Sequence, residues 1–209
     1  MKEFKHFING EYVTSASGKT FENRCPVDNS LIGMVHEAGE AEVDAAVRAA
    51  KAAMKGPWGK LTQAQRIELL NKVADRINER FDEFLEAECL DTGKPRSIAS
   101  HIDIPRGAAN FKAFSETLAN HPTEGFRMDT PDGKGALNVG HRTPKGVIAV
   151  IAPWNLPLLL MTWKVGPALA CGNTVVVKPS EETPATTTLL GEVMNECGVP
   201  AGVFNVVHG

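Results

Sequence analysis

Cysteine is scarce in this sequence. Four cysteines, Cys25, Cys89, Cys171 and Cys197, occur among 209 residues, and no two of them form a CxxC pair. Zinc ribbons and disulfide scaffolds depend on closely spaced cysteines, so the spacing argues against both classes. We therefore expect four reduced thiols in a cytoplasmic chain.

Long apolar runs and an excess of basic charge are also lacking. The longest apolar stretch, near Leu156 to Met161, is far shorter than the roughly 20 residues that span a bilayer, and the N-terminus has no apolar segment of the secretory type. The net charge is -3 and aromatic residues make up 6% of the chain. With 43% hydrophobic residues, the composition predicts a globular protein that binds neither membranes nor nucleic acids.

The glycine motifs that bind phosphates are missing. No GxGxxG and no P-loop occurs, and Gly133, Gly135 and Gly140 have the wrong spacing and do not follow a predicted strand. A dinucleotide site therefore cannot be argued from a glycine-rich loop.

The first part of the chain, residues 1–119, is predicted to combine short strands with helices. Between residues 7 and 38, short apolar runs alternate with Asn-Gly, Ser-Gly and Asp-Asn turns, a pattern typical of hairpins. Helices are predicted at residues 40–54, from the capping box of Thr62 and Gln65 as far as Asp91, and at about residues 97–118.

Residues 120–145 interrupt this pattern with clustered prolines and glycines. Because neither residue type favours the interior of a regular element, we expect an extended hairpin or arm here, with a strand at residues 136–139.

Residues 146–209 are predicted to form a βαβαβ unit. Continuous β-branched runs at 146–152, 174–177 and 203–207 are typical of strands buried on both faces of a parallel sheet. Helices are expected between them, at residues 158–170 and then from a cap at Thr183 to Gly198. The predicted class is therefore α/β, with a Rossmann-like parallel sheet that binds ligands at the carboxyl ends of its strands.

The loop after the first of these strands carries a candidate polar group, Asn155, between Pro153 and Pro157. The two prolines restrict the backbone, so the amide of Asn155 is suited to donate a hydrogen bond to a ligand oxygen, as in an oxyanion hole. The alternative is an ordinary turn residue, and the loop alone favours that alternative.

The loop after the second strand carries Lys178 and Glu181. A carboxylate and an ammonium three residues apart can bind a diol, and an acidic group on the adenosine ribose favours NAD over NADP. The alternative, a solvated charge pair before a helix, is favoured when the two residues are taken alone.

A longer pattern bears on both loops. The stretch PWNLPLLLMTWKVGPALACGNTVVVKPSEETP, residues 153–184, resembles the signature region of the aldehyde dehydrogenase superfamily. FINGEYV, DTGKP and GVPAGVFNVVHG also lie where that family has them, so the resemblance covers nearly the whole chain.

The resemblance implies a role for each matching residue. Asn155 would be the side-chain donor of the oxyanion hole, and residues 120–145 would be an arm that pairs subunits of a homo-oligomer. The residues that would bind NAD are Ile151, Ala152, Pro153, Trp154, Lys178, Ser180 and Glu181. The residues that would line the substrate route are Leu156, Leu160 and Trp163.

The family mechanism needs two further groups. A cysteine thiolate attacks the aldehyde, hydride passes to NAD, and a glutamate activates the water that releases the acid. The resemblance places both groups beyond residue 209, and Cys171, in ALACGN, is interpreted as a small packed residue. We therefore expect the N-terminal part of a longer enzyme that is inactive alone. A non-catalytic module that binds NAD or pairs subunits, and a chain that complements a separate one, remain as alternatives.

A narrower resemblance concerns the substrate. SHIDIPRGAANF, residues 100–111, resembles dehydrogenases that act on 2-hydroxymuconic or 2-aminomuconic semialdehyde, in which an arginine matching Arg106 would bind the substrate carboxylate. A guanidinium binds a carboxylate through two parallel hydrogen bonds, so the chemistry fits. The alternative is an exposed helical arginine that follows Pro105.

Overall fold

A five-stranded mixed sheet forms the centre of the molecule. The computed structural model describes residues 2–209, and the strand order is β3-β2-β10-β9-β8. The strands are β2 His6–Ile8, β3 Glu11–Val13, β8 Val147–Ile151, β9 Thr174–Lys178 and β10 Phe204–Val206. β8, β9 and β10 are parallel, whereas the hairpin of β2 and β3 adds two antiparallel strands. The predicted βαβαβ unit is confirmed, but the sheet is mixed and not wholly parallel.

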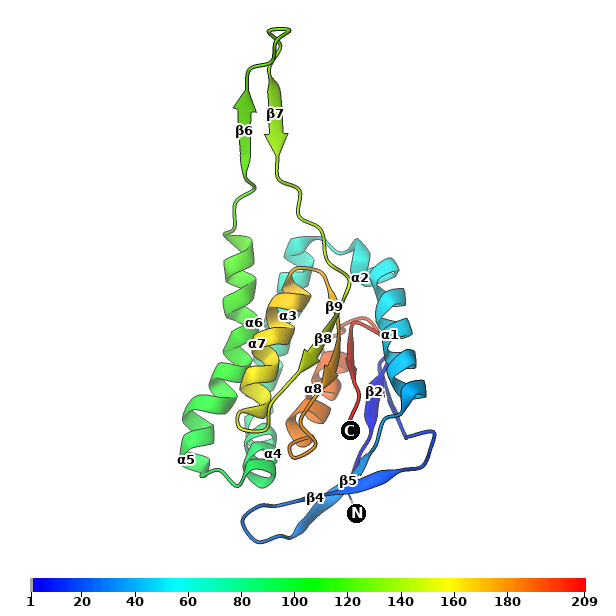
Figure 1. Cartoon of the computed structure of the whole chain (residues 1–209). Coiled ribbons are helices and arrows are strands. Elements are labelled where there is room, and N and C mark those ends of the chain that lie inside the picture. Colours follow the sequence, from blue (N-terminus) through cyan, green and yellow to red (C-terminus); the bar gives the residue numbers. More distant parts are fainter. Residues whose placement is uncertain (1) are drawn as a thin grey trace.

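Helices cover both faces of this sheet (Figure 1). The α-helices of residues 2–209 are α1 Glu40–Lys55, α2 Pro57–Lys60, α3 Gln63–Glu79, α4 Phe81–Thr92, α5 Arg96–Ile98, α6 Ile104–Ala119, α7 Pro157–Ala170 and α8 Ala185–Glu196. Side chains of β9 alternate between the two layers: Val175 and Val177 pack in the core formed with α7 and α8, and Val176 packs against α1. The fold is therefore a three-layer α/β arrangement.

The position of β8 differs from the prediction. This strand was expected to be buried on both faces, yet it lies at the edge of the sheet, where Val150 is buried while Ala149 and Ile151 are exposed. A β-branched run indicates a strand that other elements can cover on both faces. It does not show whether those elements belong to residues 2–209.

Three helix boundaries also differ from the prediction. The long helix from Thr62 breaks at Arg80 into α3 and α4, although its apolar period continues across the break. The expected helix at 97–118 contains a π-helical segment, Ala99–Asp103, which inserts a residue without ending the helical path. Thr183 does not cap α8, whose Ala185 N–H instead donates to Asp91 Oδ2 at 2.8 Å.

The N-terminal hairpins and the capping box are confirmed. Asn9 and Gly10, both with positive φ, form the tight turn between β2 and β3. A second sheet has the order β1-β5-β4, with strands β1 Lys2–Phe4, β4 Thr20–Arg24 and β5 Leu31–His36. Thr62 accepts from the Gln65 N–H while the Gln65 side chain accepts from the Thr62 N–H.

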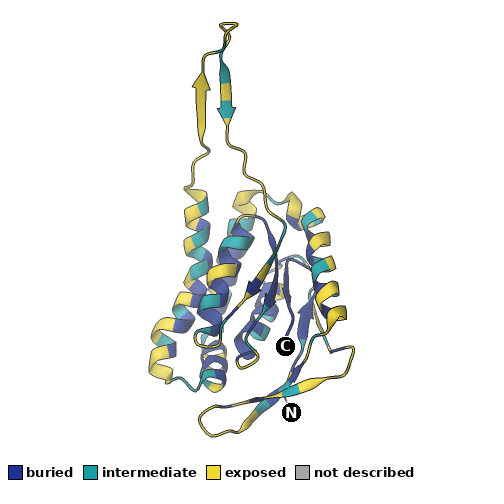
Figure 2. Cartoon of the chain, viewed as in Figure 1, coloured by how far each residue is buried: buried dark blue, intermediate teal, exposed yellow. Residues whose placement is uncertain are grey.

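A hairpin of β6 Gly125–Met128 and β7 Ala136–Val139 projects from the body (Figure 1). Most of its residues are exposed (Figure 2). Its exposed apolar side chains are Phe126, Met128, Leu137 and Val139. Among residues 2–209, no helix has the length and apolar character needed to cross a membrane.

Candidate active site

The carboxyl ends of β8 and β9 bring the two candidate loops to one edge of the sheet. Residues 154–156 bend between β8 and α7, and residues 179–184 connect β9 to α8. The Ala152 N–H donates to the Lys178 carbonyl at 3.1 Å, which joins the beginnings of the two loops. This edge is where open parallel sheets bind their ligands.

Asn155 lies in the bend before α7 with an exposed side chain. An Asx turn would require a backbone N–H two residues further on, but that residue is Pro157, which has none. The next N–H, that of Leu158, donates to Glu88 Oε2 at 3.4 Å. The geometry therefore argues against the turn alternative and leaves the Asn155 amide available to a ligand.

Large apolar side chains lie uncovered around this loop. Ile151 is 71% exposed, Trp154 is 61% exposed and Trp163 is 50% exposed. Leu156, Leu160 and Trp163 follow one another at helical spacings of four and three, which places them on one face at the start of α7. Ala152 is buried and Pro153 is half-buried beneath them. Apolar surface of this kind commonly binds a ligand or another protein surface.

The side chains of Lys178 and Ser180 converge on one carboxylate oxygen of Glu181. Lys178 Nζ lies 3.2 Å and Ser180 Oγ 3.4 Å from Glu181 Oε2. The backbone N–H of Glu181 and the Lys178 ammonium hold the pKa of this carboxyl below its usual value, so it is ionised at neutral pH. The pair is exposed and contributes little to stability, and its groups are suited to accept from and donate to sugar hydroxyls.

Arg106 is exposed in the first turn of α6. The adjacent Gly107 packs so tightly on α7 that a Cβ there would lie 2.7 Å from Leu158 Cγ. The start of α6 therefore lies directly against the first turn of α7, which follows Asn155. The structure brings the helix of Arg106 to the same end of the fold as the Asn155 loop.

A group of ionisable residues beneath this loop was not predicted from the sequence. Lys94 Nζ donates to the Asn155 carbonyl at 2.8 Å and pairs with Asp103, which is buried. Glu88, also buried, lies on α4. Glu88 follows Phe84 and Leu85 by one helical turn, so a carboxylate on an otherwise apolar face was the signal in the sequence.

Cys171 was interpreted as a packed residue, but it is exposed. It lies at the far end of the 14-residue helix α7 from Asn155, roughly 20 Å away at about 1.5 Å of rise per residue. Burial raises the pKa of the Cys89 and Cys197 thiols, and Cys25 is buried. Cys171 is therefore remote from the Asn155 loop.

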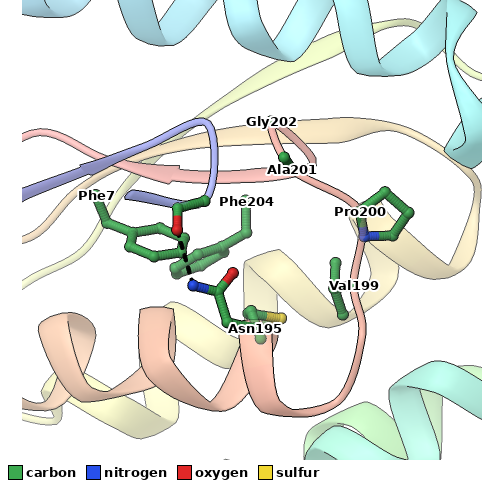
Figure 3. A pocket seen from close by; sticks show the side chains of 9 residues that line it. Phe7, Asn195, Val199, Pro200, Ala201, Gly202 and Phe204 are labelled. Atoms are coloured by element: carbon green, nitrogen blue, oxygen red, sulfur yellow. Dashed lines mark hydrogen bonds between the residues drawn. The ribbon is translucent and has the colours of Figure 1, made fainter. Parts of the chain in front are cut away.

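Two hollows in the surface lie away from the Asn155 loop. Figure 3 shows the first, a shallow depression where Asn195 Nδ2 donates to the Gly10 carbonyl at 2.8 Å beside the rings of Phe7 and Phe204. The second, a groove of about 790 Å³ at the base of the β6–β7 hairpin, is lined by Arg66 and His141 among others. Neither is lined by a predicted site residue. Because Ile151, Trp154 and Trp163 are at least half exposed, the candidate site is an open edge of the sheet.

Opposing pKa shifts predict how stability depends on pH. Burial, followed by the negative charge of Asp103, raises the pKa of Glu88 to about 8. Burial also lowers the pKa of His6 to about 4 and that of His208 to about 3. The contribution of Glu88 to the free energy of unfolding is complete below the unfolded-state pKa of glutamate and is lost as pH rises through about 8. The contributions of His6 and His208 are instead lost as pH falls below 6.5.

We expect the free energy of unfolding to fall by about 1 kcal/mol between pH 7 and pH 9, because unfolding then releases a proton from Glu88. Urea denaturation at the two pH values measures this change. Glu88→Gln cannot ionise and should remove most of this alkaline dependence, leaving the smaller part that comes from the buried thiols of Cys89 and Cys197. An unchanged dependence in that variant would rule out Glu88 as its source.

The comparisons with known proteins define the family. Residues 12–209 match the family model described as "Aldehyde dehydrogenase family". The chain belongs to the aldehyde dehydrogenase family.

Particular relatives narrow the likeness. The chain is 73% identical, over all 209 residues, to a 2-hydroxymuconic semialdehyde dehydrogenase of Pseudomonas sp. (strain CF600), of which it covers 43%. It is 55% identical over its whole length to a 2-aminomuconic 6-semialdehyde dehydrogenase of Pseudomonas sp., of which it covers 42%. The chain thus spans about two fifths of the length of these relatives.

A solved structure confirms the predicted fold. An aldehyde dehydrogenase from Bacillus cereus, determined as an NAD+ complex, is 40% identical and superposes with a TM-score of 0.93 over 100% of this chain and 42% of its own. The predicted family and Rossmann-like α/β class are therefore confirmed.

Proposed function

We propose that residues 1–209 form the NAD-binding part of a dehydrogenase that oxidises a carboxylate-bearing semialdehyde, such as 2-hydroxymuconic semialdehyde, to the acid. The observation that carries the proposal is the placement of Asn155 and the Lys178–Glu181 pair on adjoining loops at one sheet edge. The 73% identity to the Pseudomonas sp. (strain CF600) enzyme supports the substrate class.

NAD fits the chemistry of this edge. The ionised Glu181 can accept from both ribose hydroxyls while Lys178 and Ser180 orient the carboxylate and donate. Ile151, Ala152, Pro153 and Trp154 offer an apolar surface beside them. When bound, NAD supplies a hydride acceptor.

Asn155 has the central role on the substrate side. Its amide N–H would donate to the aldehyde oxygen as that oxygen gains negative charge in the transition state. The thiolate that attacks the aldehyde and the base that releases the acid are expected from protein outside residues 1–209, on the same chain or on another. Leu156, Leu160 and Trp163 would form the apolar wall along which the substrate approaches.

Arg106 would bind the substrate carboxylate. Its guanidinium is exposed, and its helix is held against the first turn of α7 by the Gly107 contact with Leu158. A planar guanidinium can bind both carboxylate oxygens and so orient an extended semialdehyde with its aldehyde towards Asn155.

The β6–β7 hairpin would pair this protein with further copies of itself. Phe126, Leu137 and Val139 are more than half exposed, and a two-stranded ribbon offers free edges for additional pairing. We place the enzyme in the cytoplasm, where its four unpaired cysteines remain reduced.

A chimera tests the proposal. Residues 1–209 are joined to the remaining sequence of the Pseudomonas sp. (strain CF600) relative, and NADH formation is followed with 2-hydroxymuconic semialdehyde. We expect kcat/KM within about tenfold of that relative, and no NADH above the buffer rate from residues 1–209 alone. A folded chimera that binds NAD without oxidising the aldehyde would favour a non-catalytic binding module and contradict the proposal.

A further inference from the structure

Two contacts hold the backbone around Asn155 from below. Lys94 Nζ donates to the Asn155 carbonyl at 2.8 Å, and Glu88 Oε2 accepts from the Leu158 N–H at 3.4 Å. Both residues come from the C-terminal end of α4 and the turn after it. The two contacts are therefore made at the Asn155–Leu156 and Pro157–Leu158 peptide groups, on either side of the Leu156–Pro157 bond.

The Lys94 position is itself determined by its neighbours. Gly93 ends α4 with φ +68, and a Cβ there would lie 2.9 Å from Pro26 Cγ, so the turn requires glycine. Lys94 pairs with Asp103, which the π-helical segment Ala99–Asp103 places in the interior with 0% exposure. The ammonium thus spans from a buried carboxylate to the carbonyl of the loop.

Glu88 compensates for a missing cap on α7. The N-cap residue of α7 is Leu156, whose side chain has no oxygen to accept from the first-turn N–H groups. Glu88, buried with 0% exposure, supplies that acceptor from α4.

The group of Glu88, Lys94 and Asp103 is poorly suited to stabilise the fold. Within residues 2–209, Glu88 Oε1 and Asp103 Oδ1 are buried without a hydrogen-bond partner. Buried charges lose hydration, and an apolar replacement of similar volume is often as stable or more so. A cluster with two unsatisfied oxygens therefore points to a role other than stability.

We infer that Lys94, Asp103 and Glu88 are positioning residues that hold the Asn155–Leu158 backbone, so that the Asn155 amide is already oriented for the aldehyde oxygen. The inference rests on the proposed oxyanion role of Asn155. Lys94 fixes the carbonyl of the donor residue, Asp103 orients Lys94, and Glu88 fixes the start of the helix that follows. Because small misplacements of a catalytic group are costly, loss of this support should act on turnover.

The test compares Lys94→Met with Lys94→Met/Asp103→Asn in the chimera. Lys94→Met leaves Asp103 buried without its partner, so both stability and kcat should fall. Adding Asp103→Asn removes that charge and should restore urea stability. We expect kcat to remain about 10- to 100-fold below that of the unaltered chimera, with KM for NAD changed less than about twofold. Recovery of kcat together with stability would show a structural role and overturn the inference.

A matched control uses an ion pair on the surface. Lys112 Nζ and Asp75 Oδ1 lie 2.5 Å apart, and both side chains are exposed. Lys112→Met/Asp75→Asn makes the same chemical change away from the loop, and kcat should stay within about twofold of the unaltered chimera. An equal loss of kcat in this control would also overturn the inference.

A mutant cycle with Asn155→Ala separates this inference from the proposed function. If Lys94 and Asp103 act through Asn155, adding their substitutions to Asn155→Ala should lower kcat by less than about twofold further. Full additivity would overturn the positioning role while leaving the oxyanion role intact. An Asn155→Ala variant with unaltered kcat would instead refute the oxyanion role, and the inference with it.

Discussion

Asn155→Ala in the chimera is expected to lower kcat by about 100- to 1,000-fold while KM for NAD changes less than about twofold. Loss of one preorganised oxyanion donor typically costs about 3–4 kcal/mol in the transition state. The Asn155 side chain is exposed at the edge of the sheet, so its removal leaves no cavity in the core. Steady-state kinetics with saturating NAD measure the loss.

Asn195→Ala provides the control for the Asn155 prediction. Asn195 also donates to a backbone carbonyl, that of Gly10, but it lies in the depression between α8 and the β2–β3 turn. The same chemical change there should leave kcat within about twofold, even if some stability is lost with the hydrogen bond. Equal losses of turnover and NAD affinity in Asn155→Ala would argue against an oxyanion role, because such a role acts on the transition state alone.

Arg106→Met is expected to lower kcat/KM for 2-hydroxymuconic semialdehyde by about 30- to 150-fold. That range corresponds to about 2–3 kcal/mol, the usual contribution of a hydrogen-bonded contact to a charged group. An uncharged aliphatic aldehyde has no carboxylate for Arg106 to bind, so its kcat/KM should change less than about threefold. Competition between the two substrates in one reaction measures the ratio directly.

Arg48→Met serves as the control for the Arg106 prediction. Arg48 is exposed on α1 and pairs with Asp44 at 3.8 Å, so its replacement removes a surface guanidinium outside the proposed site. Both substrates should react as in the unaltered chimera. If Arg106→Met lowered kcat/KM equally for the charged and the uncharged aldehyde, carboxylate recognition would have to be assigned to another residue.

Much of the fold could be predicted because its elements carry local signals. The β-branched runs of β8, β9 and β10 and the helix-length segments between them define the βαβαβ order without any contact information. Asn9-Gly10 determines the first hairpin turn by its need for positive φ. The edge position of β8 could not be predicted, because the strand pattern contains no information on which neighbours are present.

The candidate site divides in the same way. Asn155 and Glu181 occupy loops that follow predicted strands, so the topology alone indicates that they share an edge. Lys94 could not be placed there, because its contact with the Asn155 carbonyl joins residues 61 positions apart. The partner of Glu88 could not be predicted either. Glu88 lies on the apolar face of α4, and only the tertiary structure shows which element packs against that face.

The most direct test of the central claim is a crystal structure of the chimera with NAD bound. In that structure, the adenosine ribose hydroxyls should lie within about 3 Å of Lys178 Nζ and the Glu181 carboxylate, and the cofactor should cover Ile151 and Trp154. NAD bound elsewhere, for example in the groove at the base of the β6–β7 hairpin, with Lys178 and Glu181 left in solvent, would contradict it.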